Sequence, residues 1–345
     1  MKALMKYAKG DGNMEIRDIE EPNSGPGQVK IEVKNAGICG SDLHIYHGDI
    51  GIPLHYPVVT GHEFCGVVTA VGEGVTEWKA GDRVTSETAY SFCGKCVYCK
   101  TGFYNLCDER RTLGYWYNGA FTKYTVVPQE KVHALPDEID FVSGAMLEPL
   151  ACVTHAVMEL TTVKTGDVVL VMGPGAIGMM ASQDAKAQGA TVVLSGTNAD
   201  EKRLEFVKML GIDYAINSQK DDLKELIDKL TGNKGADVVF ECSGAAPALA
   251  TAIQLIKKQG SLTQIGLYGK PITVDFEKIA IKELKVTGSF GSKWTSWEKA
   301  IQLVSQGKVK LKPLASDEIP ITDWERAFKK FESKQGLKLI LKPVD

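Results

Sequence analysis

The chain has 345 residues, which is enough for about two domains. It is 44% hydrophobic and 24% charged with a formal net charge of −3, and this near balance excludes the electrostatic signatures of nucleic-acid and polybasic membrane binding. The N-terminus meets lysine and glycine before the apolar core of a secretion signal could form, and the most apolar run, residues 168–181, is too short to span a bilayer. We expect a cytoplasmic protein with reduced thiols and with no nucleic-acid or membrane partner.

Up to about residue 135 the sequence shows short β segments between turn residues. β-branched residues alternate with glycine, proline and aspartate breakers in IRDIEEP, GQVKIEVKNAG, FCGVVTAVGEGV, GDRVTSE and KYTVVPQEKVHAL. This pattern predicts a β-rich first domain.

Four cysteines crowd into one loop of this first part, residues 90–110. They have the spacing C-x2-C-x2-C-x7-C and are Cys93, Cys96, Cys99 and Cys107. Four thiolates joined by short loops suit a tetrahedral Zn²⁺ that is closed to substrate, so we predict a structural zinc. The alternative, four free or redox-active thiols, would leave their crowding a coincidence.

Further potential metal ligands are scattered along the chain. Cys39 is followed by Ser41 and His44, His62 and Glu63 are adjacent, and Glu148 stands in an apolar stretch beside a proline. One cysteine, one histidine and one or two carboxylates form a plausible open site for a catalytic zinc. Spacing alone does not establish such a site, because a single histidine is more often a core or surface residue.

Near residue 140 the pattern changes to helices that alternate with apolar strands. A helix is predicted within 143–160. Strands that are apolar throughout then alternate with helices near 176–188, 200–210, 221–230 and 247–258. Such strands are typical of a parallel sheet covered on both faces. We expect a doubly wound α/β domain here.

A glycine motif follows the first of these strands. Gly173, Gly175 and Gly178 have the G-x-G-x-x-G spacing, with Ala176 and Ile177 between them at the start of a helix. Glycines at these positions let the pyrophosphate of a dinucleotide approach the helix N-terminus. The alternative is a glycine-rich turn in an ordinary α/β domain.

The second apolar strand of the predicted α/β domain, residues 191–196, ends in residues that indicate which cofactor is bound. It reads Ser195-Gly196 followed by Thr197, with no carboxylate before Asp200. A carboxylate at this point binds the ribose hydroxyls of NAD, so its absence favours NADP(H) at least as much as NAD(H). Potential donors to a 2′-phosphate are Thr197, Lys202 and Arg203. In the alternative, Asp200 reaches back to the ribose.

Taken together, these motifs resemble the zinc-containing medium-chain alcohol dehydrogenase family. The resemblance rests on GHEFCGVVTAVGEGV, CGSDLH, the four-cysteine loop, GDRV and GPGAIG, which occur in the family's order, and on EPLACVTHA, which is most similar to the sorbitol/iditol branch. It implies a GroES-like, β-rich catalytic domain in residues 1–150, a Rossmann domain in 151–290, and a return to the catalytic domain in 291–345.

The resemblance also implies roles for the scattered ligands. Cys39, His62 and Glu63 would hold the catalytic zinc, and Glu148 would contact it directly or through water. Ser41 and His44 would carry the hydroxyl proton to solvent. The implied reaction is the reversible oxidation of a secondary alcohol, a polyol or vicinal diol, to a ketone by hydride transfer to NAD(P).

The sequence defines the substrate less closely than it defines the reaction. An Arg-Tyr pair that contacts the polyol in sorbitol dehydrogenases is absent from residues 290–293, which leaves open a smaller alcohol or a phosphorylated one bound by Lys293. A threonine dehydrogenase usually has Asp at the position of Glu148. A protein that binds a structural zinc and a nucleotide but catalyses no reaction remains an alternative.

By family analogy we expect a homo-oligomer, a tetramer or a dimer.

Overall fold

The computed structural model describes residues 1–344 and divides into two compact units. Unit 1 comprises Met1–Pro149, Ser292–Ile301 and Leu311–Asp345, and unit 2 comprises Leu150–Gly291 and Gln302–Lys310. Of the predicted return segment, 291–345, residues 291 and 302–310 lie in unit 2. In this unit the side chain of Gln183 binds both the N–H and the carbonyl of Lys310, at 2.8 and 3.4 Å.

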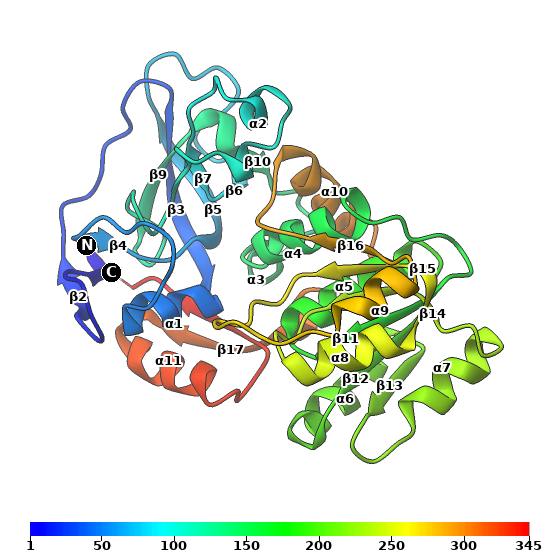
Figure 1. Ribbon diagram of the computed structural model, residues 1–345. Coiled ribbons are helices and arrows are strands. Elements are labelled where there is room, and N and C mark those ends of the chain that lie inside the picture. The colour runs from blue at the N-terminus through cyan, green and yellow to red at the C-terminus, as the bar shows by residue number, and fades with distance from the viewer. Residues whose placement is uncertain (345) are drawn as a thin grey trace. The chain divides into compact units, whose positions relative to one another are not determined.

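Unit 1 is built mainly of β-structure (Figure 1). One sheet has seven strands in the order β10-β6-β5-β3-β18-β17, with β9 also paired to β3, a second has the order β2-β1-β4, and β7 pairs with β8. The strands are β1 (Lys2–Lys6), β2 (Met14–Asp18), β3 (Gln28–Gly37), β4 (Val58–Val59), β5 (Glu63–Val71), β6 (Arg83–Ser86), β7 (Ala89–Ser91), β8 (Arg111–Thr112), β9 (Tyr124–Pro128), β10 (Val132–Ala134), β17 (Ala315–Pro320) and β18 (Lys338–Lys342). The helices are α1 (Gly40–His47), α2 (Val97–Lys100), α3 (Phe141–Gly144), the first part of α4 (Leu147–Thr154) and of α10 (Trp294–Ser305), and α11 (Trp324–Glu332).

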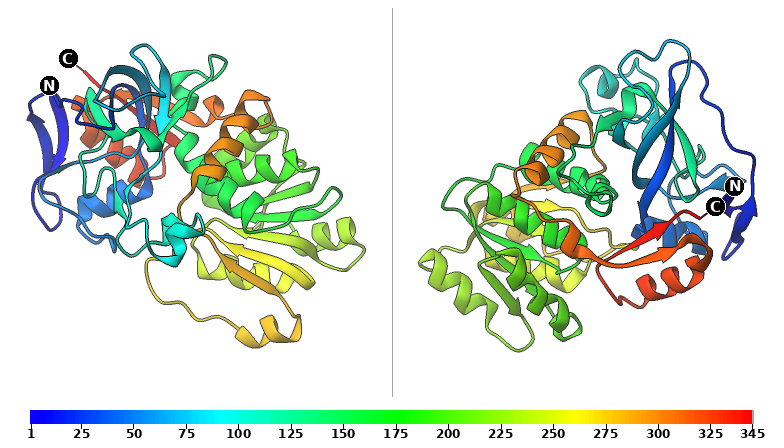
Figure 2. Two further views of the ribbon diagram at one scale, coloured as in Figure 1. Left: turned by 90° about the horizontal axis from the view of Figure 1, so that it is seen from above. Right: turned by 180° about the vertical axis from the view of Figure 1, so that it is seen from behind.

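The core of unit 1 joins the two ends of the chain. Buried side chains of β3 pack with Trp324 and Phe328 of α11 and with Leu339 and Leu341 of β18. Figure 2 shows α11 beside β17 and β18, the red C-terminal elements. The last 30 or so residues of the chain therefore complete the core of the first domain. They do so because the apolar face of the amphipathic helix α11 must be buried.

Unit 2 contains a six-stranded parallel sheet in the order β13-β12-β11-β14-β15-β16, the order of a doubly wound dinucleotide-binding fold. Its strands are β11 (Val168–Met172), β12 (Thr191–Gly196), β13 (Tyr214–Asn217), β14 (Ala236–Glu241), β15 (Ile256–Gln264) and β16 (Lys285–Gly288). Its helices are α5 (Ala176–Ala187), α6 (Glu201–Val207), α7 (Leu223–Thr231), α8 (Ala246–Leu255) and α9 (Phe276–Ile281).

The predicted fold class, a β-rich domain with a doubly wound parallel-sheet domain, is confirmed. All five residues of β11 are buried, as expected for a central strand covered on both faces. Two helices differ in detail from the prediction. The helix expected near 247–258 ends at Leu255, where the chain turns extended, and the one expected within 143–160 is α4 continued by a π-helical turn, His155–Glu159.

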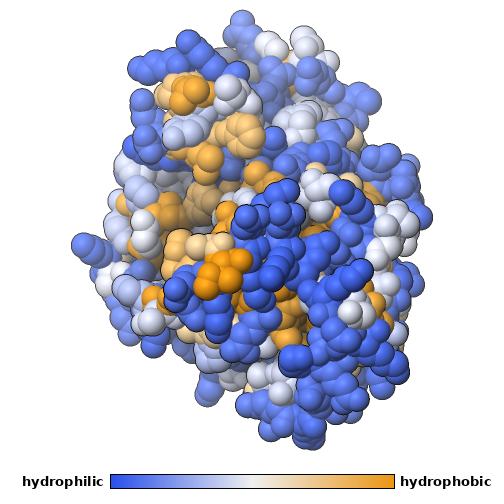
Figure 3. All heavy atoms as spheres, turned by 45° about the vertical axis from the view of Figure 1, so that its right-hand side comes forward, coloured by the Kyte–Doolittle hydropathy of each residue, from blue (hydrophilic) through white to orange (hydrophobic). Residues whose placement is uncertain are grey.

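The surface of the described residues is mainly hydrophilic on the face seen in Figure 3, with apolar residues exposed in several places. Among residues 1–344, no helix combines the length and the apolar character needed to cross a bilayer. The exposed apolar side chains include several on the segment that follows β15 in unit 2: Leu267, Phe276, Ile281, Val286 and Phe290.

Candidate active site and cofactor sites

Three potential metal ligands meet in unit 1 where β3, β5 and α1 come together. Cys39 is the N-cap of α1, two residues after the end of β3, and the register of β3 on β5 places Gly37 opposite Glu63. His62 immediately precedes β5. The ligand atoms of Cys39, His62 and Glu63 all lie within 4.8 Å of one another. Residues that are distant in sequence thus form a single cluster.

Glycines make this close approach possible. A Cβ atom on Gly37 would overlap the carboxylate of Glu63. Gly61, beside His62, has a φ of +89°, and a Cβ there would lie 2.5 Å from the ring of Phe121. The first glycine leaves space for a ligand side chain, and the second adopts a backbone conformation that other residues rarely tolerate.

Two polar groups orient His62. Its Nδ1 lies 3.6 Å from Oδ1 of Asp42, which is completely buried and which also accepts a hydrogen bond from the backbone N–H of Cys39 at 2.9 Å. Its Nε2 lies 3.4 Å from the hydroxyl of Ser41. A carboxylate on one nitrogen of a histidine fixes the ring so that the other nitrogen faces a metal.

Glu63 has a partner that the sequence did not reveal. The ammonium group of Lys338, the first residue of β18, pairs with Glu63 Oε2 and donates a hydrogen bond to the carbonyl of Ile38 at 2.7 Å. Both side chains are buried. The other carboxylate oxygen, Oε1, is buried and has no hydrogen-bond partner within residues 1–344.

The electrostatics of the cluster favour a cation. Burial raises the pKa of Asp42 to about 6, and the nearby imidazole of His62 opposes that rise. Burial would lower the pKa of His62, but the charges of Asp42 and Cys39 outweigh it and raise that pKa to about 10. A thiol, an imidazole and an unpartnered carboxylate oxygen in one buried place fit the ligand set of an open zinc site.

The other predicted residues of this site lie at its border. Glu148, in the first turn of α4, is buried, and its charge helps to raise the pKa of His62, but it is not one of the three converging ligands. His44 is exposed, and its Nδ1 lies 3.0 Å from Oδ1 of Asp49. Ser41 is therefore the predicted proton carrier that reaches the cluster directly.

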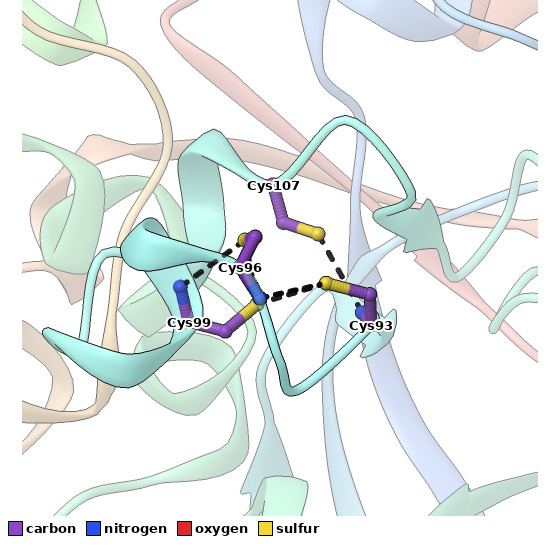
Figure 4. Close-up of side chains that lie close together, drawn as sticks. All are labelled: Cys93, Cys96, Cys99 and Cys107. Carbon is purple, nitrogen blue, oxygen red and sulfur yellow. Dashed lines mark hydrogen bonds between the residues drawn. The ribbon is translucent and has the colours of Figure 1, made fainter.

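The four loop cysteines form a second cluster (Figure 4). All eight cysteines of the chain are free thiols, and the sulfur of Cys99 lies 3.8 Å from that of Cys93 and 3.4 Å from that of Cys96. Sulfur atoms at ~2.3 Å from a tetrahedral zinc lie about 3.8 Å apart. Hydrogen bonds from the backbone N–H groups of Lys95 and Cys96 lower the pKa of Cys93 to about 6. The geometry fits a structural zinc.

A buried lysine stands beneath this cysteine loop. The ammonium group of Lys131 lies 4.4 Å from the ring centroids of both Phe92 and Tyr104 and 3.9 Å from Oε1 of Glu87. The hydroxyl of Tyr104 donates a hydrogen bond to Oε2 of Glu87 at 2.6 Å. The sequence did not single out Lys131, because nothing in the local pattern marks this lysine as buried.

The glycine motif of unit 2 forms the expected strand–turn–helix. Gly173 has a φ of +101°, and a Cβ on it would lie 2.8 Å from Cβ of Ser243. A Cβ on Gly178 would overlap the carbonyl of Gly173. Gly175 is the N-cap of α5 and has open space where a Cβ would stand, and Ala176 and Ile177 form the first turn of the helix. The free N–H groups of that turn fit a pyrophosphate.

The residues after β12 are arranged around Asp200. Its Oδ2 accepts hydrogen bonds from the N–H and the hydroxyl of Thr197, at 3.1 and 2.9 Å, and its Oδ1 lies 3.8 Å from the guanidinium of Arg203. Lys202 is exposed. A Cβ on Gly196 would lie 2.8 Å from the Pro174 ring, so this glycine permits packing on the glycine turn. The Ser195 hydroxyl is buried without a partner in the described residues.

Comparison with known proteins identifies the class. Two family models match the chain, the alcohol dehydrogenase GroES-like domain over residues 25–137 and the zinc-binding dehydrogenase over residues 176–306. Together with the relatives described next, which align along the full chain, they show that the protein belongs to the zinc-binding, medium-chain alcohol dehydrogenase family.

The relatives include dehydrogenases named for a polyol and for a polyol phosphate. The chain is 47% identical to a sorbitol dehydrogenase from Halalkalibacterium halodurans, with 100% of both chains covered. It is 38% identical to a D-arabitol-phosphate dehydrogenase from Enterococcus avium, with 99% of this chain and 97% of the relative covered. The crystal structure of 2R,3R-butanediol dehydrogenase from Bacillus subtilis superposes with a TM-score of 0.88 at 33% identity, with 99% of each chain covered. These findings confirm the predicted family, the GroES-like domain and the class of activity, an alcohol or polyol dehydrogenase.

Proposed function

We propose that this protein is a zinc-dependent, NAD(P)-linked dehydrogenase that reversibly oxidises a secondary alcohol of a polyol, vicinal diol or polyol phosphate to a ketone. The observation that carries the proposal is the buried cluster of Cys39, His62 and Glu63. It offers one thiolate beside one carboxylate, in place of the two thiolates of simple alcohol dehydrogenases. A protein without turnover would need none of these ligands, and all of them are present.

The protein's own residues prepare the site for proton removal. When bound, the zinc would act as a Lewis acid toward the substrate oxygen. Asp42 holds Nδ1 of His62 so that Nε2 points into the cluster, and Lys338 holds one oxygen of Glu63 so that Oε1 remains available. The hydroxyl of Ser41, 3.4 Å from Nε2 of His62, would take up the substrate proton, and the exposed His44 would pass it to solvent.

The substrate class is supported by the relatives and by one positively charged side chain, that of Lys293. Of the two relatives, one is named for a free polyol, sorbitol, and the other for a polyol phosphate, D-arabitol phosphate. In this chain the ammonium of Lys293 lies 4.2 Å from the ring centroid of Phe103. We propose Lys293 as the group that would bind a substrate phosphate.

A substrate panel tests this proposal. Sorbitol, other polyols, vicinal diols and polyol phosphates are each assayed with NAD⁺ and NADP⁺, and secondary alcohols are expected to react. If phosphorylated polyols are preferred, Lys293→Met should raise their KM and leave that of free polyols unchanged. A panel in which only primary alcohols or aldehydes react contradicts the proposal.

We also propose that NADP(H) is used at least as well as NAD(H). The guanidinium of Arg203 lies 3.8 Å from Asp200, and the carboxylate of Asp200 accepts hydrogen bonds from Thr197, the residue after β12, where a 2′-phosphate would lie. Asp200 stands at the same place and supports the alternative, since a carboxylate favours the free ribose hydroxyls. Arg203→Ala should weaken the binding of NADP⁺ more than that of NAD⁺, and Lys208→Ala serves as the control, because Lys208 is an exposed lysine directly after α6. A wild-type preference for NAD(H) of tenfold or more refutes this part of the proposal.

Finally, we propose a homo-oligomer, a tetramer or dimer, in the cytoplasm. β16 is the outer strand of the parallel sheet, and its outer edge is unpaired within residues 1–344. Phe276, Ile281 and Val286, on or near this strand, are 73%, 67% and 48% exposed. An open strand edge with apolar neighbours usually pairs with another chain. Reduced thiols in the cysteine loop suit a reducing compartment.

A further inference from the structure

A buried lysine in unit 1 takes no part in the proposed reaction. Lys6 is the last residue of β1, and its exposed fraction is 0%. Its ammonium group donates hydrogen bonds to the main-chain carbonyls of Gly10 and Gly12, at 2.5 Å each, and of Tyr46 at 3.0 Å. These acceptors come from two places in the chain, the turn that joins β1 to β2 (the β1–β2 turn, residues 7–13) and the last turn of α1.

The contacts of Lys6 are those of a charged ammonium group. Its three N–H donors match the three carbonyl acceptors, whereas a neutral amine would direct its lone pair at one of these oxygens. Burial lowers the pKa of Lys6, and the charge of Asp11 opposes that shift. Without the ammonium group, three carbonyl oxygens would face one buried place without their donor, which is costly.

The contact with Tyr46 completes the C-terminal end of α1. The last carbonyls of a helix lack partners within the helix. Here the N–H of Gly48, the C-cap, donates to the carbonyls of His44 and Ile45, and Lys6 donates to that of Tyr46. A cation at this end of a helix also interacts favourably with the helix dipole.

The β1–β2 turn lies directly against the same end of α1. A Cβ atom on Gly48 would lie 2.7 Å from the carbonyl carbon of Gly10, so the two backbones are in contact. His47 forms a further contact, since its Nδ1 lies 2.9 Å from Oδ1 of Asp11. Lys6 therefore joins β1, the turn and α1 at one point.

The other end of α1 carries groups of the metal cluster. Cys39 is its N-cap, the hydroxyl of Ser41 lies 3.4 Å from Nε2 of His62, and Oδ1 of Asp42 lies 3.6 Å from Nδ1 of the same histidine. A helix of eight residues is about 12 Å long and is held together by its own hydrogen bonds. A shift of its C-terminal end therefore changes the position of these groups as well.

We propose that Lys6 is a positioning residue of the metal cluster, which fixes the C-terminal end of α1 and so holds Cys39 and Asp42 in place for zinc binding. This inference rests on the proposed function, because it presupposes that the cluster binds zinc. The groups that support a metal site must hold its ligands to within ~0.5 Å. Asp42 touches a ligand directly, and Lys6 acts through the helix. We therefore expect an effect of about tenfold on zinc affinity, the lower end of the range for groups behind the ligands.

Competition with a chelator tests the inference without any need for turnover. Zinc affinity is measured in the wild type, Lys6→Met and Lys9→Met, with Cys39→Ser as the reference for the zinc of the cysteine loop alone. Lys6→Met keeps a long side chain but has no donor, and it should bind the cluster zinc about tenfold more weakly, with the loop zinc unchanged. Lys9→Met should bind both as the wild type does, because Lys9 is exposed on the same turn.

Chemical rescue separates the action of the ammonium group from a general loss of stability. A lysine with a structural role alone would lower the Tm and leave the zinc affinity of the folded protein unchanged. Lys6→Ala leaves room for a small ammonium ion at the three carbonyls, so propylammonium should restore its zinc affinity toward that of the wild type. Tetramethylammonium has the same charge but no N–H donor and should not. Lys6→Met, whose side chain fills the site, should respond to neither ion.

Two results overturn the inference: a folded Lys6→Met that binds the cluster zinc as tightly as the wild type, or a Lys6→Ala whose zinc affinity is restored by neither ion or equally by both. Lys6→Ala can be folded in propylammonium and its zinc affinity followed as the ion is removed, so the test holds even if Lys6→Met does not fold. Failure of the proposed function looks different. In that case the wild type contains no more zinc than Cys39→Ser, and the inference is overturned with it.

Discussion

At the scale of single residues, the carboxylate of Asp42 controls how the metal cluster is assembled. It lies behind His62, is completely buried and also caps α1 through the N–H of Cys39. One side chain thus sets the orientation of a histidine ligand and the position of a cysteine ligand. Partners of this kind that lie behind the ligands typically change metal affinity by 10- to 100-fold.

We therefore expect Asp42→Asn to weaken zinc binding at this cluster by roughly 10- to 100-fold, because the neutral amide no longer attracts Nδ1 of His62. Competition with a chelator of known affinity measures the change. Asp49→Asn is the matched control, because Asp49 forms an exposed pair with His44 and should leave the affinity unchanged. Equal zinc affinity in Asp42→Asn and the wild type would show that Asp42 does not orient the ligand.

At the scale of elements, the cysteine loop is joined to the β-domain through Lys131. Burial lowers the pKa of this lysine, and the charge of Glu87 opposes that shift. Lys131→Met keeps the volume but removes the cation between two aromatic rings and leaves Glu87 unbalanced. We expect the free energy of unfolding to fall by about 3 kcal/mol in urea titrations.

The control for Lys131 is Lys95→Met, because Lys95 is exposed on the same loop. Its replacement should change the free energy of unfolding by no more than about 0.5 kcal/mol. If the two variants are equally stable, Lys131 does not connect the loop to the rest of unit 1.

A second element-scale contact depends on pH. His47 at the end of α1 lies between Asp11, in the turn after β1, and Glu332 at the end of α11, with both N–O distances 2.9 Å. The hydrogen bond to Asp11 is the largest cause that raises the pKa of His47, and Glu332 adds to it. A raised folded-state pKa means that this contact stabilises the fold fully below the ordinary histidine value of about 6.5 and is lost as pH rises through the higher folded value.

The Tm difference between wild type and His47→Gln should therefore be largest below about pH 6.5 and shrink at higher pH. The difference should be small because the pair is partly exposed to solvent. Thermal melts across this pH range measure it. A difference that grows with pH has the opposite sign and would rule out the protonated His47 contact.

At the scale of the whole molecule, the proposed assembly would depend on the open edge of unit 2. A charged side chain on β16 should prevent pairing of two such edges, so Val286→Asp is expected to convert the oligomer to the mass of one chain in light scattering. Met209→Asp is the control, because Met209 is 66% exposed and lies outside the segment 267–290. A wild-type protein that is monomeric at micromolar concentration would exclude the proposed assembly.

The sequence predicted those parts of the molecule that depend on neighbouring residues. The four cysteines and the glycine turn are each contained in a short stretch, and their geometry follows from their spacing and, for the glycines, from the strand and the helix on either side. The pairing of Lys338 with Glu63 could not be predicted, because it arises only when β18 is placed beside β3 in the sheet. Lys131 was missed for a related reason: burial of a charged residue is set by tertiary packing, and the local pattern does not reveal it.

Metal content together with turnover tests most directly whether Cys39, His62 and Glu63 hold a catalytic zinc that is separate from the cysteine loop. Zinc per chain and rate of polyol oxidation are measured in wild type, Cys39→Ser and Cys65→Ser. Cys65 is a buried cysteine outside both clusters, and its thiol donates to the carbonyl of Phe141 at 3.0 Å, a contact that serine can replace. We predict about two zinc ions for wild type and Cys65→Ser, and about one zinc with no turnover for a folded Cys39→Ser. A folded wild type with one zinc or none, or an active Cys39→Ser, would contradict the two-site assignment.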